Sequence, residues 1–178
     1  MTLYPEMFIS IWHVAVLILG VIAWIAMVAG GYERKTVFKS TAGAFIAFYV
    51  IVTIPVAVAT YDLKYTEQQM FESLQEHYER KMVDYSDPSE LDKVVLSVGV
   101  FENRDGDYQM KVYAGNFSET LEFKGEVTVY FYDENDKKIK DETYEHISLK
   151  PGEKKEIDSF WGENQTGTYR YFFEEDVE

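Results

Sequence analysis

This chain of 178 residues contains no cysteine, only four prolines and only three histidines. The absence of cysteine excludes disulfide bonds, thiolate catalysis and metal sites built from thiolates. The sequence also lacks a GxSxG elbow, an HExxH helix, a glycine-rich phosphate loop and a dinucleotide fingerprint. We therefore expect a protein that is not an enzyme and that has no cofactor and no bound metal.

Asp, Glu, Lys and Arg are missing from two long apolar stretches near the start, Met7 to Gly31 and Thr41 to Thr60. A helix of roughly 20 apolar residues spans the hydrocarbon core of a bilayer. The sequence therefore predicts a two-helix transmembrane hairpin over residues 1–62, with helices at about 7–31 and 41–60. A cleaved signal peptide is the alternative for the first stretch, but it has Glu6 where a basic segment belongs.

The distribution of charge predicts the orientation in the membrane. The link at 32–40 carries Arg34, Lys35 and Lys39 and is short and net basic, whereas the N-terminal segment has no basic residue. Short basic loops remain in the cytoplasm. We expect a two-pass cell-membrane protein with loop 32–40 cytoplasmic and with the N-terminus and the C-terminal region outside.

The region after residue 60 is strongly acidic. The first 60 residues carry three basic and two acidic side chains, a net charge of +1, so the total of −14 leaves −15 on the remainder. Such a field repels nucleic acid and anionic lipid. We expect no nucleic-acid partner.

Small residues recur four apart in both apolar stretches, Ala26 with Gly30 and Gly43 with Ala47. This spacing allows helix backbones to approach closely. The pairs either pack the two helices against each other or bind a partner subunit, and the sequence leaves both interpretations open.

His13 is the only histidine within the apolar stretches, which contain no Asp, Glu, Lys or Arg. An ionisable group inside a membrane suggests a haem ligand, a proton relay or a hydrogen bond to a partner helix. His13 lies about two turns from the outer end, beside Trp12, and a bis-histidine haem site lacks a second histidine there. We favour an interfacial or partner-bonding histidine.

Residues 63–92 follow as a predicted stalk. Positions 63–85 contain no Gly or Pro, and apolar residues that include Met70, Leu74 and Tyr78 recur at helical spacing. The apolar stripe must therefore contact protein, which is the β domain, a second copy of the chain or another subunit. Pro88 ends the helix.

From residue 93 the apolar pattern becomes alternating, which is typical of strands. Asp105 and Gly106 form a two-residue hairpin signal. Between 121 and 131 every second residue is apolar except for Gly125, which we expect at a bulge or a close approach. Six or seven short strands with regular turns predict an antiparallel β-sandwich over residues 93–178.

One run within this region carries a family resemblance. Residues 115–160 resemble bacterial immunoglobulin-like domains of the FxLYD type, at the positions Asn116, Ser118, Phe131, Tyr132, Asp133, Leu149, Pro151, Gly152 and Glu153. The resemblance covers about 80 residues and implies an immunoglobulin-like fold and a cell-surface binding or adaptor module without catalysis. The matched positions are turn and core residues rather than a site.

Two surface features of the β domain have competing explanations. The acidic turn at 133–136 suggests calcium, but it fails the EF-hand pattern, and an Asx-rich turn explains it. Aromatic residues are dense in the strands, with Trp161 among them, and the pattern places Tyr130 and Tyr132 on an outer face. They serve either as an interaction surface or as cross-strand pairs. The sequons at Asn116 and Asn164 matter only in a host that glycosylates asparagine.

Together these patterns predict a non-enzymatic accessory subunit that presents an extracytoplasmic interaction domain. Its partners would be the bilayer and either a larger integral membrane protein or a second copy of the chain. One alternative is a surface receptor for a soluble ligand, a cell-wall polymer or a cation. The other is a haem- or quinone-linked respiratory subunit that uses His13.

Overall fold

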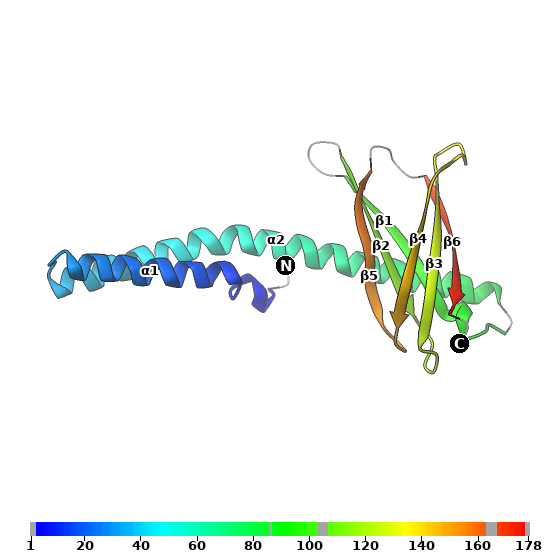
Figure 1. Cartoon of the computed structure of the whole chain (residues 1–178), viewed down its shortest axis with the longest axis horizontal. Helices are drawn as coiled ribbons and strands as arrows, with labels where there is room; N and C mark the ends of the chain where they lie inside the picture. Colours follow the sequence, from blue (N-terminus) through cyan, green and yellow to red (C-terminus); the bar gives the residue numbers. More distant parts are fainter. Residues whose placement is uncertain (1–2, 86, 103–106, 163–166, 177–178) are drawn as a thin grey trace. The chain divides into compact units, whose positions relative to one another are not determined.

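A computed structural model describes residues 3–85, 87–102, 107–162 and 167–176 of the chain. The chain divides into two compact units, Met1–Glu67 and Gln68–Glu178. The first unit contains the 3-10 helix η1 (Pro5–Met7), helix α1 (Ile11–Ala29) and the beginning of helix α2 (Arg34–Asp84). The second contains the rest of α2, the short helix η2 (Leu91–Lys93) and the strands (Figure 1).

Both long helices are apolar enough to cross a membrane, judged by length and composition. The prediction of a loop at 32–40 is wrong for most of its length, because α2 begins at Arg34. Residues 34–40 contain neither Gly nor Pro, so nothing in them stops a helix. The turn falls instead at residues 30–33, where Gly31 has a φ of 74° that glycine adopts without a steric penalty.

Helix α2 is one continuous helix of 51 residues with Pro55 inside it. The predicted stalk is the last part of this helix, and residues from Gln68 onward belong to the second compact unit. No Gly or Pro lies between Pro55 and Asp84, which explains the continuity. The predicted stalk helix thus continues from the second apolar stretch without a break.

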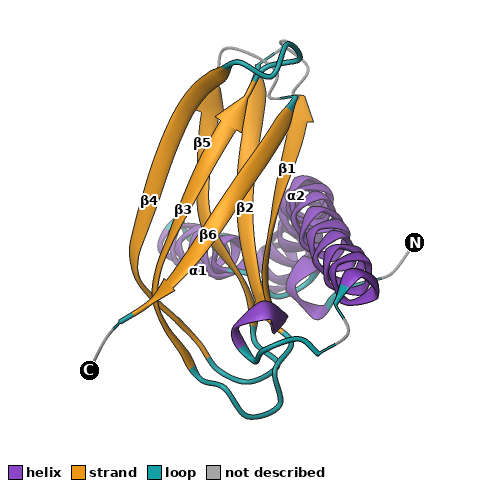
Figure 2. Cartoon of the chain, turned by 90° about the vertical axis from the view of Figure 1, so that its right-hand side faces the viewer, coloured by secondary structure: helices purple, strands orange, loops and turns teal. Residues whose placement is uncertain are grey.

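The described strands form two antiparallel sheets of three strands each, packed in a sandwich-like arrangement (Figure 2). One sheet has the order β1-β2-β5 and the other the order β4-β3-β6. The strand bounds are β1 Val94–Glu102, β2 Tyr108–Asn116, β3 Phe123–Tyr132, β4 Lys138–Leu149, β5 Lys154–Gly162 and β6 Thr168–Glu175. The predicted turn at Asp105 and Gly106 lies outside the described residues.

The core lies between the sheets and is formed by alternate residues. On β3, Phe123, Val127, Val129 and Phe131 are buried, as the pattern predicted. Gly125 is also buried on this face. The position must be glycine, because a Cβ atom there would lie 1.9 Å from the carbonyl oxygen of Glu174. The register shifts beside it, so both the bulge and the close approach are confirmed.

Candidate functional site

His13 joins the two helices of the first unit. Its Nε2 lies 3.0 Å from the Thr53 hydroxyl, and that hydroxyl donates to the Tyr49 carbonyl oxygen at 2.7 Å. The Ser10 amide donates to Nδ1 at 3.1 Å. Nδ1 therefore accepts this bond, and Nε2–H donates to the Thr53 hydroxyl.

This network accounts for the only histidine of the apolar stretches. His13 is 7% exposed and bonds the other helix of its own hairpin, as well as its own helix cap. An axial bond to haem iron needs a ring nitrogen with a free lone pair. Both ring nitrogens of His13 already have hydrogen-bond partners. The arrangement therefore suits a structural hydrogen bond between the two helices better than an iron ligand.

The small-residue pairs lie on the outside of the hairpin. Ala26, Gly30, Gly43 and Ala47 are all exposed. The helices approach instead at Gly20, where a Cβ atom would lie 3.1 Å from the ring of Phe45. Packing of α1 on α2 through the small pairs is therefore wrong.

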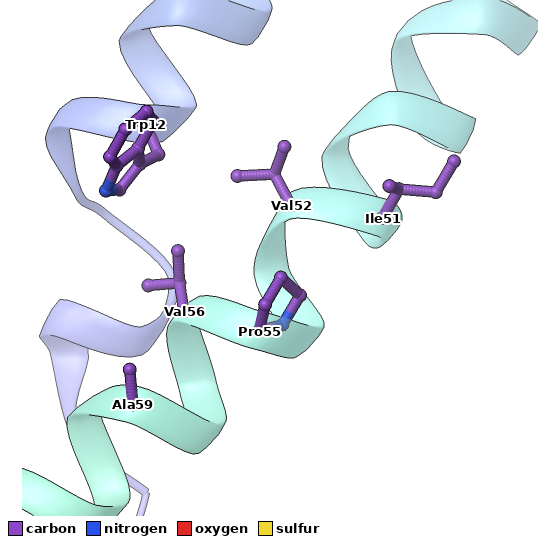
Figure 3. A pocket seen from close by; sticks show the side chains of 6 residues that line it. All are labelled: Trp12, Ile51, Val52, Pro55, Val56 and Ala59. Carbon is purple, nitrogen blue, oxygen red and sulfur yellow. The ribbon is translucent and has the colours of Figure 1, made fainter.

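An apolar pocket of about 390 Å³ lies beside Pro55 in the first unit. Trp12 of α1 lines one side, and Ile51, Val52, Pro55, Val56 and Ala59 of α2 line the other (Figure 3). Proline has no amide hydrogen and so leaves a carbonyl of the preceding turn without its helical partner. All six lining residues are apolar, so the pocket suits the binding of an aliphatic chain rather than catalysis.

The apolar stripe of the predicted stalk contacts the sandwich of the same chain. Met70 is 2% exposed and Leu74 is fully buried, and both cluster with Val95 and Tyr113 of the first sheet. Tyr78 is half-buried and stacks on Phe117, with ring centroids 4.4 Å apart. Met70 and Leu74 therefore belong to the domain core and not to an exposed surface.

Polar contacts run along the same seam between helix and sheet. The hydroxyls of Ser73 and Ser97 lie 2.7 Å apart, and His77 Nδ1 lies 3.1 Å from the carbonyl oxygen of Leu96. The Tyr169 hydroxyl also lies 3.1 Å from this nitrogen. Burial raises the pKa of Tyr169, so the phenol stays protonated and available for hydrogen bonding.

Tyr130 and Tyr132 lie on the outer face of β3, as predicted, and both are half-buried. The ammonium group of Lys138 lies 4.7 Å from the Tyr130 ring centroid, and the guanidinium of Arg170 lies 4.8 Å from that of Tyr132. Phe172 meets Tyr130 edge to face at 6.1 Å. Contacts across the strands thus account for these rings without a partner.

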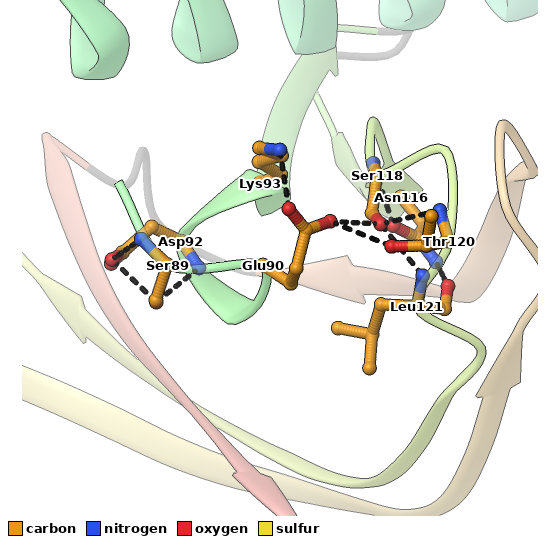
Figure 4. A network of polar contacts seen from close by, with 8 residues as sticks. All are labelled: Ser89, Glu90, Asp92, Lys93, Asn116, Ser118, Thr120 and Leu121. Carbon is orange, nitrogen blue, oxygen red and sulfur yellow. Dashed lines mark hydrogen bonds and ion pairs between the residues drawn. The ribbon is translucent and has the colours of Figure 1, made fainter. Parts of the chain in front are cut away.

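Asn116 and Ser118, which carry the family resemblance, have structural roles (Figure 4). Asn116 is fully buried, and its Nδ2 donates to the carbonyl oxygens of Leu121 at 2.7 Å and Leu149 at 3.1 Å. Its Oδ1 accepts from the Ser118 amide. These bonds tie the link between β2 and β3 to the end of β4. The second sequon, at Asn164, lies outside the described residues.

Glu90 completes the network in Figure 4. Its carboxylate accepts from Lys93 at 2.6 Å and also from the hydroxyl of Ser118. These bonds lower the pKa of Glu90 below its usual range, and the bond from Lys93 has the largest effect. Sequence reasoning missed Glu90, although the neighbouring Ser89 and Asp92 show the spacing of a capping box and bond each other reciprocally.

The acidic turn between β3 and β4 is an Asx-type turn. Asp133 Oδ1 accepts from the amides of Asn135 and Lys137, each at 2.9 Å. The described residues contain no group of three or more His, Asp or Glu side chains arranged to hold a metal.

A polar pocket of about 480 Å³ opens between β4 and β5. The register of β4 shifts here, with His146 at a φ of 57°, so His146 is exposed while Tyr144 faces the core. The bulge inverts the alternation of the strand, so these two residues lie on opposite faces although they are two positions apart. Among the described residues the Tyr144 hydroxyl has no hydrogen-bond partner, and burial, followed by the nearby charge of Asp158, raises its pKa.

Comparison of the chain with protein-family models, with curated proteins and with solved structures finds no match.

Proposed function

We propose that this chain is a non-enzymatic, two-pass membrane protein that docks on a larger integral membrane protein and presents an immunoglobulin-like domain outside the cell. The membrane assignment is supported by the surfaces of α1 and α2. Only 11% and 0% of their most apolar windows are buried within the described chain. A core helix of a soluble protein would be mostly buried, whereas helices in lipid expose apolar side chains.

The orientation follows from charge. Arg34, Lys35 and Lys39 lie at the start of α2, beside the turn at 30–33, and support a cytoplasmic position for that turn. The strongly acidic second unit then lies outside. The two antiparallel three-stranded sheets and the Asn116 network support an immunoglobulin-like domain of the FxLYD type.

The docking proposal is carried by the exposed small-residue face of α2. Gly43 and Ala47 are exposed, and among the described residues no atom outside the adjoining turns of its own helix lies within 4 Å of a Cβ built at Gly43. The contact between α1 and α2 leaves this face unused. In lipid, where no hydrophobic drive joins helices, close approach at small residues is a main source of helix association.

Purification from native membranes in mild detergent tests this function, with Gly43→Leu as the test variant and Ile46→Leu as the control on the same helix. Ile46 is 64% exposed and carries no small side chain. We expect a partner membrane protein to co-purify with the wild type and with Ile46→Leu but not with Gly43→Leu. Recovery of all three as lone monomers contradicts the proposal.

The receptor alternative is favoured by one observation, the polar pocket between β4 and β5. Its lining mixes acidic, basic and hydroxyl side chains, including Glu145, His146 and Lys155. Titration of the full chain with calcium and with cell-wall fragments tests it. Chemical-shift changes confined to β4 and β5 would support this alternative.

A further inference from the structure

Strand β6 forms one free edge of the sheet β4-β3-β6 (Figure 2). It pairs with β3 without a register shift, and no described segment pairs with its other side. Next to β6, the Asp176 amide donates to the carbonyl oxygen of Lys124 on β3. Backbone groups alternate in direction along an antiparallel strand, so those of Tyr169, Tyr171 and Phe173 are directed to the free edge.

The other three edges of the sandwich carry features that block an added strand. On β1, Nδ1 of His77 from α2 lies 3.1 Å from the carbonyl oxygen of Leu96. On β4 the register shifts twice against β3, and on β5 it shifts once against β2. Lys155 of β5 is paired with the core residue Ala114, and its ammonium group donates to the carbonyl oxygen of Ser148 on β4. Bulges and inward-facing charges of this kind protect sheet edges.

Strand β6 lacks these protections over the length that the structure describes. It contains no Gly or Pro, and its pairing with β3 is regular from Thr168 to Glu175. Its side chains Tyr169, Tyr171 and Phe173 are aromatic and pack against the core. A regular, unprotected edge is a template for a further strand. The row of backbone donors and acceptors therefore selects an extended polypeptide rather than a lipid or a small molecule.

The outer face of β6 has a charge pattern that is complementary to itself. Arg170, Phe172 and Glu174 lie on this face, two residues apart, and Phe172 is 61% exposed. Glu174 is paired directly with Glu126 of β3, and like charges in such a pair repel. Arg170 lies 3.3 Å from Asp136 in an exposed ion pair, which is a weak interaction. If a second β6 pairs antiparallel about Phe172, Arg170 of each copy faces Glu174 of the other.

The direction of the backbone groups agrees with this register. Tyr171 then pairs with Phe173 of the second copy, and both residues direct their amide and carbonyl groups to the free edge. Phe172 faces its own symmetry mate in a non-hydrogen-bonded pair, in which the side chains are closest. One register thus satisfies the hydrogen bonds, the charges and the exposed aromatic ring together.

We propose that the free edge of β6 pairs with the β6 edge of a second copy of this chain, so that two three-stranded sheets join into one of six strands about a two-fold axis at Phe172. The interface is isologous, and each contact occurs twice. Arg170 of the second copy supplies a positive charge beside the carboxylates of Glu126 and Glu174. One strand per chain makes a small interface, so the dimer is weak and depends on concentration.

Cysteine cross-linking tests this pairing in the full chain in mild detergent, because the native chain has no cysteine. Phe172→Cys places two thiols across the axis, where Cα atoms about 4.5 Å apart allow a disulfide. Thr143→Cys is the control, because Thr143 is exposed in the same row of the outer face but lies on β4. With copper phenanthroline as oxidant, we expect Phe172→Cys to form the dimer at least about tenfold faster. Equal rates overturn the proposal.

Exchange of charges tests whether the occupant is a second copy. Arg170→Glu alone and Glu174→Arg alone each place like charges opposite each other. We expect sedimentation to show a dimer at least about tenfold weaker for each variant than for the wild type. An equimolar mixture of the two variants restores both opposite-charge pairs and should dimerise, which also shows that both variants are folded. A mixture that does not associate overturns the proposal.

This inference goes beyond the proposed function, and the two fail separately. A wild-type chain that stays monomeric at every concentration overturns the dimer, even where a partner membrane protein co-purifies. A dimer without any partner membrane protein supports the inference and contradicts the proposed function. Cross-linking of Phe172→Cys in native membranes to a different protein, without a homodimer, assigns the edge to a strand of that protein and overturns the pairing of two copies.

Discussion

The two sheets of the sandwich share one core but differ on their outer faces. On β1-β2-β5 the last part of α2 covers the outer face and buries Leu74 completely. On β4-β3-β6 the outer face has no covering helix among the described residues, and Tyr130 and Tyr132 are half-buried by neighbouring cations. Alternation in a strand thus shows which side chains share a face but not whether that face is covered.

Removing a large side chain from the covered face should have the largest effect. Leu74→Ala leaves a cavity between helix and sheet, and we expect it to lower the free energy of unfolding by about 2–5 kcal/mol. Phe172→Ala on the uncovered face should cost less than about 1 kcal/mol. Denaturant unfolding of the full chain in mild detergent, followed by near-UV circular dichroism, measures both. Equal losses would mean that α2 does not stabilise the sheet.

Two ion pairs of the sandwich compare a nearly buried lysine with an exposed one. Lys111 is 11% exposed and pairs with Glu156, whereas Lys140 is 44% exposed and pairs with Glu142. Both glutamates are 37% exposed. Glu156→Gln leaves a nearly buried ammonium without its carboxylate and should cost about 1–3 kcal/mol. Glu142→Gln should change stability by less than about 0.5 kcal/mol. The same unfolding measurement decides, and similar costs would mean that burial of the lysine does not set the cost of losing its partner.

The network around Glu90, in the turn that follows α2, should make the stability of the sandwich depend on pH in the acidic range. The lowered pKa of Glu90 means that its carboxylate is favoured in the folded state. The resulting stability is fully present above the ordinary glutamate pKa of about 4.3, and it is lost as pH falls through the lower folded value. The difference in Tm between wild type and Glu90→Gln should therefore shrink as pH falls below about 4.

The control for this prediction is Glu119→Gln, which removes an exposed carboxylate outside the network of Figure 4. Its Tm difference from wild type should stay nearly constant over the same pH range. A Glu90→Gln difference that is independent of pH would show that the network does not favour the carboxylate.

The smallest effect should come from the uncovered face itself. Tyr130→Ala removes a ring that contacts Phe172 and Lys138, and we expect a loss of about 0.2–1 kcal/mol. Tyr130→Phe keeps the ring and should be nearly neutral. A loss above about 2 kcal/mol would mean that this face is buried in a way that the cross-strand contacts do not explain.

Much of the sandwich was predictable, because its signals are local. Alternation predicted the buried face of β3, the missing side chain of Gly125 predicted a bulge or a close approach, and the acidic run at 133–136 predicted a turn. The matched residues Asn116 and Ser118 are turn and core residues, as expected. Each of these features depends on the pattern of the sequence within a few residues.

The remaining features depend on contacts between distant segments. The sequence allowed three partners for the stripe of Met70 and Leu74, and only folding shows that it is the chain's own sheet. The bulge at His146 depends on how β4 pairs with β3, and it inverts the alternation of side chains along β4. The small residues of the hairpin suggested an internal contact, but the helices approach at Gly20 and are latched by His13, whose partner Thr53 lies 40 residues away.

The burial of Asn116 has a consequence for producing this protein. Its side-chain nitrogen makes two hydrogen bonds inside the domain, so a sugar on that atom and the native packing exclude each other. A eukaryotic secretory host that modifies asparagine on the nascent polypeptide would commit each modified molecule to misfolding. Bacterial expression, or replacement of Ser118 by a residue that ends the acceptor motif, avoids this loss, although the second route gives up the bond to Glu90.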